Sequence, residues 1–264
     1  MSTLSLATRD SATMLRRSLR HTIRYPVMII VSLAVPVLIL LLFVGVLGGA
    51  LNAGINTGTH GASYADYIVP GILVMTVGYG ASTTAMSVNR DMTEGIIARF
   101  RTMAIARSSV LTGHVVAALL RTMASVGLVI GVALLLGFRS SCGPVGWIAA
   151  LGLTALIVLA LSWLAAAVGL AARNAEGTSS FTLIVQLLPF ISSAFVPTGS
   201  MSGAVRWFAQ HEPFTPIIDT LRGLLTGTAI GDSGTIAVAW CLVLTLVGYL
   251  WARSLFKRDP RPAS

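Results

Sequence analysis

The sequence predicts an all-α membrane protein with six transmembrane helices. Of its 264 residues, 55% are hydrophobic and only 10% are charged, and the mean hydropathy is +0.84. A soluble domain of this length carries more charge. The apolar residues also form long runs, and a helix needs roughly 20 such residues to cross the hydrocarbon core. Runs of this length satisfy their backbone groups in lipid as helices.

Six apolar runs follow one another within a single transmembrane domain at 26–252. Their bounds are 26–49, 67–88, 111–138, 147–172, 181–197 and 236–251. The first run is too long for the apolar part of a cleavable signal peptide. The fifth is shorter and contains Pro189, which predicts a broken helix because proline lacks a backbone N–H.

The basic residues predict the orientation. Fourteen of the 18 Lys and Arg residues precede the first run, follow the second or fourth, or lie in the basic tail at 253–264. Three lie on the opposite side, and Arg121 lies within the third run. The positive-inside rule therefore places both termini in the cytoplasm. Because the basic residues are scattered over separate flanking segments, they do not indicate a nucleic-acid partner.

The amino-terminal segment, 1–25, predicts a cytoplasmic amphipathic helix at the interface. An apolar stripe with helical spacing lies beside a face rich in arginine. Such a helix lies among the headgroups of membrane lipids. A solvated basic tail is the alternative.

The loop at 89–109 mixes charges with large apolar residues. Its apolar set is Met92, Ile96, Ile97, Phe100 and Met103. A loop that only has to stay in water does not need these side chains. They favour either a helix that docks onto a cytoplasmic partner or a helix that lies on the membrane surface, and the residues alone leave both open.

The outer segment, 198–235, combines proline and glycine with many large apolar residues. This composition predicts short helices that re-enter the outer leaflet, where a broken backbone can be satisfied within protein. An ordinary folded loop is the alternative. Arg121 is expected near the cytoplasmic edge of the third span, where a structural role is favoured over a substrate contact.

The chain shows no catalytic or metal site and no nucleotide-binding motif. A P-loop needs Gly-Lys-Ser/Thr, and the single lysine, Lys257, stands between Phe256 and Arg258. The four histidines have no metal-ligand spacing. His211 and Glu212 are adjacent, but the prolines that follow favour a helix-end role. No carboxylate is expected at mid-depth, which disfavours an ion-driven carrier. Energy is therefore expected from a partner that docks at a cytoplasmic loop.

Several stretches of the chain form a pattern that occurs together in one family. The longest is 195–216, which continues to Asp219, Arg222 and Gly223. The others are the Tyr-Ile-Val-Pro-Gly of 67–71, then Asp91, Gly95, the Arg-Phe-Arg of 99–101, and Gly113. In order along nearly the whole chain, they resemble the ABC-2 type permeases, and especially their daunorubicin/doxorubicin-resistance branch of drug-efflux permeases. One departure is Ala104, where the branch often has proline just before the next helix.

This resemblance implies the membrane-spanning subunit of an ATP-driven exporter in the bacterial plasma membrane. Two permease subunits, identical or paralogous, would pair above two ATP-binding subunits that hold ATP and Mg²⁺, while this chain holds no cofactor. ATP-driven closure would move a coupling helix and switch the cavity from inward- to outward-facing. The residues it assigns to ATPase coupling are Arg90, Asp91, Met92, Glu94, Gly95, Ile96, Arg99, Phe100 and Arg101.

By the same analogy, spans one, two and five would line the path of a hydrophobic drug or natural product. The wall residues would be Met75, Tyr79, Thr182, Gln186, Phe190 and Phe195. Two alternatives remain: an ABC-2 exporter of lipid-linked glycan or lipid, and an ion-driven secondary transporter.

Overall fold

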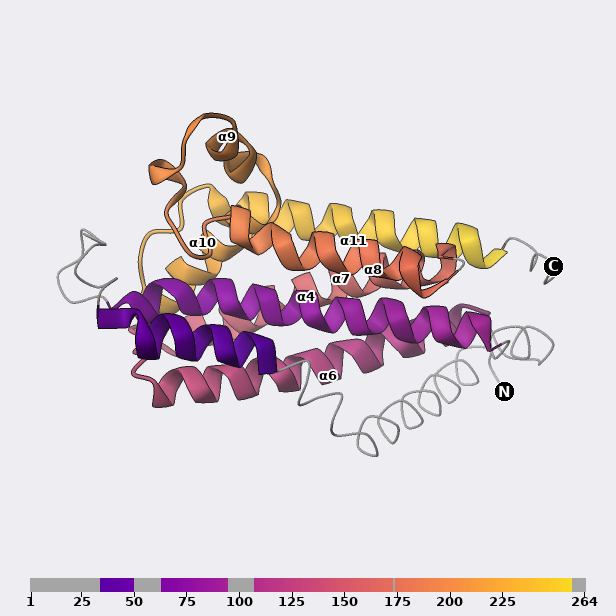
Figure 1. Ribbon diagram of the computed structural model, residues 1–264, viewed down its shortest axis with the longest axis horizontal. Helices are drawn as coiled ribbons and strands as arrows, with labels where there is room; N and C mark the ends of the chain where they lie inside the picture. The colour runs from indigo at the N-terminus through magenta and orange to yellow at the C-terminus, as the bar shows by residue number, and fades with distance from the viewer. Residues whose placement is uncertain (1–33, 50–62, 95–106, 173, 258–264) are drawn as a thin grey trace.

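The computed structural model describes residues 34–49, 63–94, 107–172 and 174–257, and all regular structure in these ranges is helical (Figure 1). The predicted helix at 1–25 lies outside the described residues. A short apolar helix, Ala34–Val46, ends in a π-helical turn, η1 (Leu41–Val46). The remaining elements are α4 (Tyr64–Thr93), α6 (Arg107–Leu135), α7 (Pro144–Ala171), α8 (Ala175–Leu187), η2 (Leu188–Ile191), η3 (Thr198–Ser200), α9 (Gly203–His211), α10 (Phe214–Thr226) and α11 (Ser233–Lys257).

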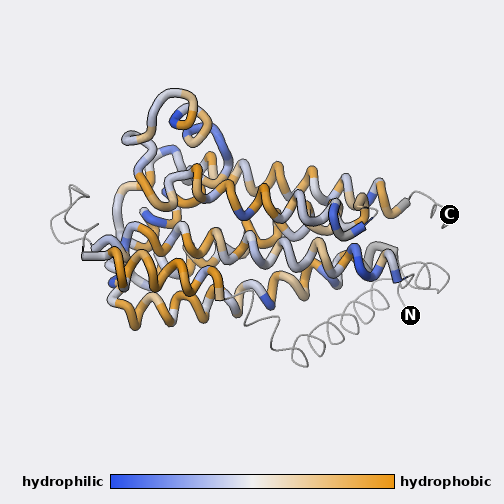
Figure 2. Tube along the Cα trace, viewed as in Figure 1, coloured by the Kyte–Doolittle hydropathy of each residue, from blue (hydrophilic) through white to orange (hydrophobic). Residues whose placement is uncertain are grey.

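Among the described residues, four helices are long and apolar enough to cross a membrane. They are α4, the Leu111–Leu135 part of α6, α7, and the Ser233–Phe256 part of α11. They correspond to the predicted second, third, fourth and sixth runs. Each begins ahead of its predicted run, because a helix continues through flanking polar residues that the apolar pattern excludes. Figure 2 shows hydrophobic residues along much of these helices.

The long helices lie side by side along the longest axis of the molecule (Figure 1). We call the two ends of this bundle the Tyr64 end and the Thr93 end, after the bounds of α4. The Tyr64 end of α4 is fixed by a capping box. The Ala65 N–H donates to Ser63 Oγ at 3.3 Å, and the Ser63 N–H donates to Asp66 Oδ2 at 2.9 Å.

Helix α4 is the central helix of the bundle. In its most apolar stretch 83% is buried, compared with 22% in α11. It packs against α6, α7, α8 and α10. At Gly169 of α7 a Cβ would come within 2.6 Å of the Ala85 carbonyl oxygen, so the absence of a side chain allows α7 to approach α4 closely.

The predicted fifth run differs from the structure at both ends. Helix α8 already begins at Ala175, where the Asn174 side chain accepts from the Gly177 N–H at 3.2 Å. It gives way at Leu188 to the 3₁₀ turn η2, which contains Pro189. Residues 192–197 then form no regular helix. The break at Pro189 is therefore confirmed, but the apolar run continues beyond the end of the helix.

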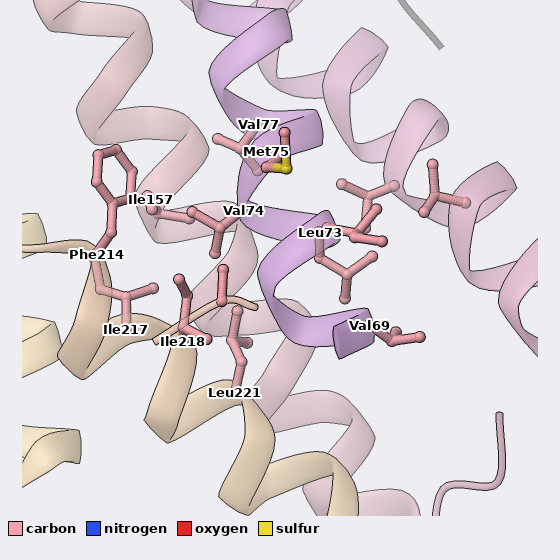
Figure 3. Close-up of a cluster of buried hydrophobic side chains, with 14 of the residues drawn as sticks. Val69, Leu73, Val74, Met75, Val77, Ile157, Phe214, Ile217, Ile218 and Leu221 are labelled. Carbon is pink, nitrogen blue, oxygen red and sulfur yellow. The ribbon is translucent and has the colours of Figure 1, made fainter. Parts of the chain in front are cut away.

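The predicted outer segment contains two short α-helices, α9 and α10, at the Tyr64 end. Helix α9 projects from the side of the bundle (Figure 1). Helix α10 instead belongs to the core, since Phe214, Ile217, Ile218 and Leu221 are each at most 3% exposed. Figure 3 shows them beside side chains of α4 and α7. Helix α10 ends at Gly227, whose φ of 71° suits glycine.

Candidate substrate pathway and coupling surface

The Thr93 end holds the described part of the predicted coupling residues. Arg90 and Glu94 are exposed and form an ion pair with 2.6 Å between Nε and Oε1. Asp91 instead turns into the bundle, where its Oδ2 lies 3.1 Å from His114 Nε2 of α6. Met92 packs against the buried cluster of Leu111 and Phe256. The other members of the predicted set, Gly95, Ile96, Arg99, Phe100 and Arg101, lie outside the described residues.

Asn89 ties the same end of α4 to α7. Its side-chain amide donates to the carbonyl oxygens of Ala172, at 2.9 Å, and Gly169, at 3.3 Å. Gly169 lies in the last turn of α7 and Ala172 directly follows it, where the helix end leaves carbonyl oxygens without a helical donor. Sequence reasoning missed this residue, because nothing in the local pattern marks a contact across 80 residues. The end of α4 is thus joined to both α6 and α7.

Arg121 bridges α6 and α4. Its Nη2 donates to Thr83 Oγ1 and Thr84 Oγ1, each at 3.1 Å. It is the fifteenth of the 29 residues of α6 and so lies at the centre of that helix. The structure therefore gives Arg121 a helix-to-helix contact, as the structural role predicts, but the predicted position near the cytoplasmic edge of the span is wrong, because the residue lies midway along α6.

Of the predicted wall residues, the structure brings two together. Phe190 and Phe195 stack with centroids 4.9 Å apart and planes 9° apart. Phe190 is 46% exposed, whereas Phe195 is 7% exposed. Met75 is 2% exposed and lies in the hydrophobic core of the chain (Figure 3). The remaining three, Tyr79, Thr182 and Gln186, are partly exposed.

The stacked pair belongs to a longer aromatic row at the Tyr64 end. Phe43 of the first helix lies 5.0 Å from the Phe195 ring and 6.4 Å from the Tyr64 ring. Tyr64 in turn lies 6.3 Å from Tyr67. The row joins the first helix, α4 and the segment after α8, which are the three predicted lining elements. Sequence reasoning missed Phe43 and both tyrosines, although all three fall near the same predicted end of their spans.

A polar network centred on Arg222 of α10 contacts Tyr67, the last ring of this row. The guanidinium donates to Asp219 Oδ1 at 2.6 Å, to the Ser193 carbonyl at 2.7 Å and to the Tyr67 carbonyl at 3.2 Å. It also stacks over the Tyr67 ring, 3.9 Å from the centroid. We call Arg222, Asp219, Ser193 and Tyr67 the Arg222 network.

Ser193 brings the interrupted segment into this network. Its hydroxyl donates to Asp219 Oδ1 at 2.7 Å, and its carbonyl also accepts from the Tyr67 hydroxyl at 3.0 Å. Its N–H donates to Thr215 Oγ1 at 3.2 Å. These bonds satisfy backbone groups that the broken helix leaves without a helical partner. The sequence predicted the break, but it did not predict what holds it.

Glu212 caps α10 and does not form an acid–base pair with His211. Its two carboxylate oxygens accept from the N–H groups of Phe214, at 2.8 Å, and Thr215, at 2.5 Å. Burial raises the pKa of the Glu212 carboxyl, against the opposing effect of these hydrogen bonds. The His211 ring instead stacks on Trp207, with centroids 4.7 Å apart. The expected helix-end role is confirmed.

Comparisons with known proteins show which family the chain belongs to. The family profile described as ABC-2 type transporter matches residues 10–226. The chain is 30% identical over 167 residues to the daunorubicin resistance ABC transporter permease protein DrrB1 of Streptomyces coeruleorubidus, covering 63% of this chain and 59% of the relative. It is 23% identical over 189 residues to the probable doxorubicin resistance ABC transporter permease protein DrrC of Mycobacterium tuberculosis, covering 69% and 68%.

The match thus spans about three fifths of the first relative's length. The family profile, in contrast, extends over most of the chain, from the amino-terminal segment to the last residue of α10. With four helices in its described part that are long enough to cross a membrane, the protein is a multi-pass membrane protein, and it belongs to the ABC-2 type transporter family.

Proposed function

We propose that this chain is the membrane-spanning subunit of an ATP-driven exporter of hydrophobic drugs or natural products. One observation carries the proposal: this chain belongs to a transporter family, yet its single lysine, Lys257, lies outside any P-loop sequence. The energy for transport then comes from a separate ATP-binding subunit. Two copies of that subunit pair with two permease subunits, which are either identical or paralogous.

The proposed architecture has six spans and cytoplasmic termini in the bacterial plasma membrane. The first helix and α8 complete the count with the four long helices. Helix α8 has only 13 residues and spans with the help of η2 and residues 192–197. The Thr93 end then faces the cytoplasm, where the basic residues of the sequence concentrate.

The proposed coupling surface begins at the exposed Arg90–Glu94 pair and continues through the Arg-Phe-Arg of 99–101. It rests in a groove of the ATP-binding subunit, with the apolar residues as anchors. Because Asn89 and Asp91 bind α7 and α6, a displacement of this surface moves three helices together. This rigid connection supports a coupling role.

The proposed cargo path follows the first helix, α4 and α8, towards the aromatic row at the Tyr64 end. Phe190 supplies an exposed aromatic surface, and Tyr79, Thr182 and Gln186 supply partly exposed positions along the walls. The Arg222 network holds the interrupted segment and forms the outer end of the path. Alternating access requires ATP or cargo to bind the inward- and outward-facing states with different affinities.

The test is purification from the native membrane in mild detergent, with mass identification of bound chains. We expect a stoichiometric ATP-binding subunit whose ATP hydrolysis is stimulated by hydrophobic drugs. A folded, monodisperse preparation without that subunit would contradict the proposal. An ion-driven carrier would behave differently: a protonophore would abolish its transport, whereas depletion of ATP at a constant ion gradient would leave transport unchanged. Stimulation only by lipid-linked glycan or lipid would identify the other exporter class.

A further inference from the structure

Arg121 carries a positive charge at the centre of an apolar helix. Fourteen residues separate it from each end of α6, which corresponds to about 21 Å along the helix at 1.5 Å per residue. A helix of this length extends across the hydrocarbon core and both interfaces. The phosphate layers of the two leaflets then lie beyond the reach of the Arg121 side chain.

The hydrogen-bond partners of Arg121 leave its charge uncompensated. Thr83 and Thr84 are neutral, and both hydroxyls donate to the Gly80 carbonyl at 2.8 Å, so toward the guanidinium they can only accept. These two bonds use Nη2. The N–H groups at Nε and Nη1 have no hydrogen-bond partner within the described ranges.

No carboxylate of the described residues lies at this depth. The described acidic residues lie at or near the two ends of the bundle, and Arg121 forms no ion pair with any of them. The remaining two, Asp10 and Asp259, belong to the terminal segments, outside the six apolar runs. A neutral side chain could join α4 to α6 at a smaller desolvation cost than a charged one. The charge therefore calls for an anion from outside the chain.

Amphipathic cargo fits the surface around this charge. Tyr79 and Met86 lie four residues before and three residues after Thr83, so they share the face of α4 that Arg121 touches. Tyr79, Thr83 and Arg121 are partly exposed, and Met86 is 49% exposed. An aromatic and a thioether side chain thus lie one turn before and one turn after Thr83 on this face, and Tyr79 also belongs to the proposed cargo path.

We propose that Arg121 binds the anionic group of an amphipathic cargo, a carboxylate or a phosphate, within the membrane. Thr83 and Thr84 orient the guanidinium, and Tyr79 and Met86 contact the apolar part of the cargo. The site favours anionic over cationic amphiphiles of the same shape. This inference rests on the proposed export function, since it specifies the class of molecule that the path accepts.

The experiment compares two fluorescent probes with the same dansyl group and the same eleven-carbon chain, one ending in a carboxylate and the other in an amine. Binding to the full-length protein in phosphatidylcholine nanodiscs is measured by dansyl fluorescence. We expect wild type to bind the carboxylate about tenfold more tightly, in the range of one charge-assisted hydrogen bond. Arg121→Gln should remove this preference, and Arg121→Lys should retain part of it. Arg206→Gln, at an exposed arginine of α9, is the control.

Each other outcome overturns the inference. Equal affinity of the wild-type protein for both probes would overturn it, and this comparison needs no variant. The inference therefore stays testable even if Arg121→Gln does not fold. A purely structural arginine predicts that Arg121→Gln weakens both probes equally and lowers the Tm. If anionic phosphatidylglycerol in the nanodisc abolishes carboxylate binding, a lipid headgroup occupies the site in place of cargo. Because the assay contains no ATP-binding subunit, its result is independent of the co-purification test.

Discussion

At the scale of single residues, Arg222 joins α10 to both α4 and the interrupted segment. Its side chain contacts Tyr67 of α4 and Ser193 after α8 as well as Asp219 on its own helix. Arginine suits this position because one planar guanidinium can donate in several directions and also stack on a ring. Lysine has a single nitrogen and cannot reproduce this geometry.

We therefore expect Arg222→Met to lower the free energy of unfolding by about 2 kcal/mol, the value of a hydrogen bond to a charged group, and the Tm by about 4–8 °C. Arg222→Lys should recover only part of the loss. The Tm of the detergent-solubilised protein measures both. Arg206→Met is the matched control, because this arginine lies exposed on α9 and its loss should change little. Equal Tm values for Arg222→Met and Arg206→Met would show that the network does not stabilise the fold.

At the scale of elements, the contact between α4 and the interrupted segment depends on Gly71. A Cβ at this position would lie 2.5 Å from Ala194 Cβ and 2.8 Å from Ala194 Cα. We expect Gly71→Ala to displace residues 192–197 and to cost about 1–3 kcal/mol, as overpacking does. Gly127→Ala is the control, since nothing lies within 4 Å of its Cβ position in α6. Thermal unfolding that shifts equally for both variants would contradict this close contact.

The elements also show what a sequence can reveal about such a protein. Apolar runs predicted four long helices, because burial in lipid imposes hydrophobicity over a whole span. Pro189 predicted the break in the fifth, because its effect is local. Pairs such as Asn89 with Ala172, or Ser193 with Asp219, were not predictable, because their partners lie 83 and 26 residues apart. The apolar pattern of the outer segment indicated that it is not a free loop. The pattern did not indicate that α10 enters the core.

The same limit applies to the candidate site. The resemblance selected Phe190 and Phe195, which the structure stacks together, but it also selected Met75, which is buried in one subunit. The spacing of residues along a helix shows which residues share a face, but it does not show which face another helix covers. The coupling role of all the residues from 90 to 101 remains a prediction.

At the scale of the whole molecule, the proposed orientation places Cys142 outside the cell. It is partly exposed in the connection between α6 and α7, at the Tyr64 end, while Cys241 of α11 is fully buried. A membrane-impermeant maleimide should therefore label intact cells at Cys142, and Cys142→Ser should abolish the labelling. Ser264→Cys, added to Cys142→Ser, should react only after permeabilisation. The reverse pattern would invert the topology.

Coupling is also a property of the whole complex, and it gives the sharpest test of the Thr93 end. Glu94 is exposed and paired only to Arg90 of its own helix among the described residues, so charge reversal there leaves the bundle intact while it disturbs a docked partner. We expect Glu94→Arg, and likewise Phe100→Ala, to lower the amount of cargo exported per ATP hydrolysed by about tenfold, since docking energy concentrates in a few anchor residues.

The measurement is export and ATP hydrolysis by the same proteoliposomes, with insertion of each variant verified. Glu176→Arg is the matched control, because Glu176 is also an exposed acid at the Thr93 end, in the first turn of α8. It should leave the ratio unchanged, because the proposed docking surface begins on α4. Wild-type export by well-inserted Glu94→Arg and Phe100→Ala proteins would remove the coupling role from this loop. A loss in Glu176→Arg alone would move the docking surface to the start of α8.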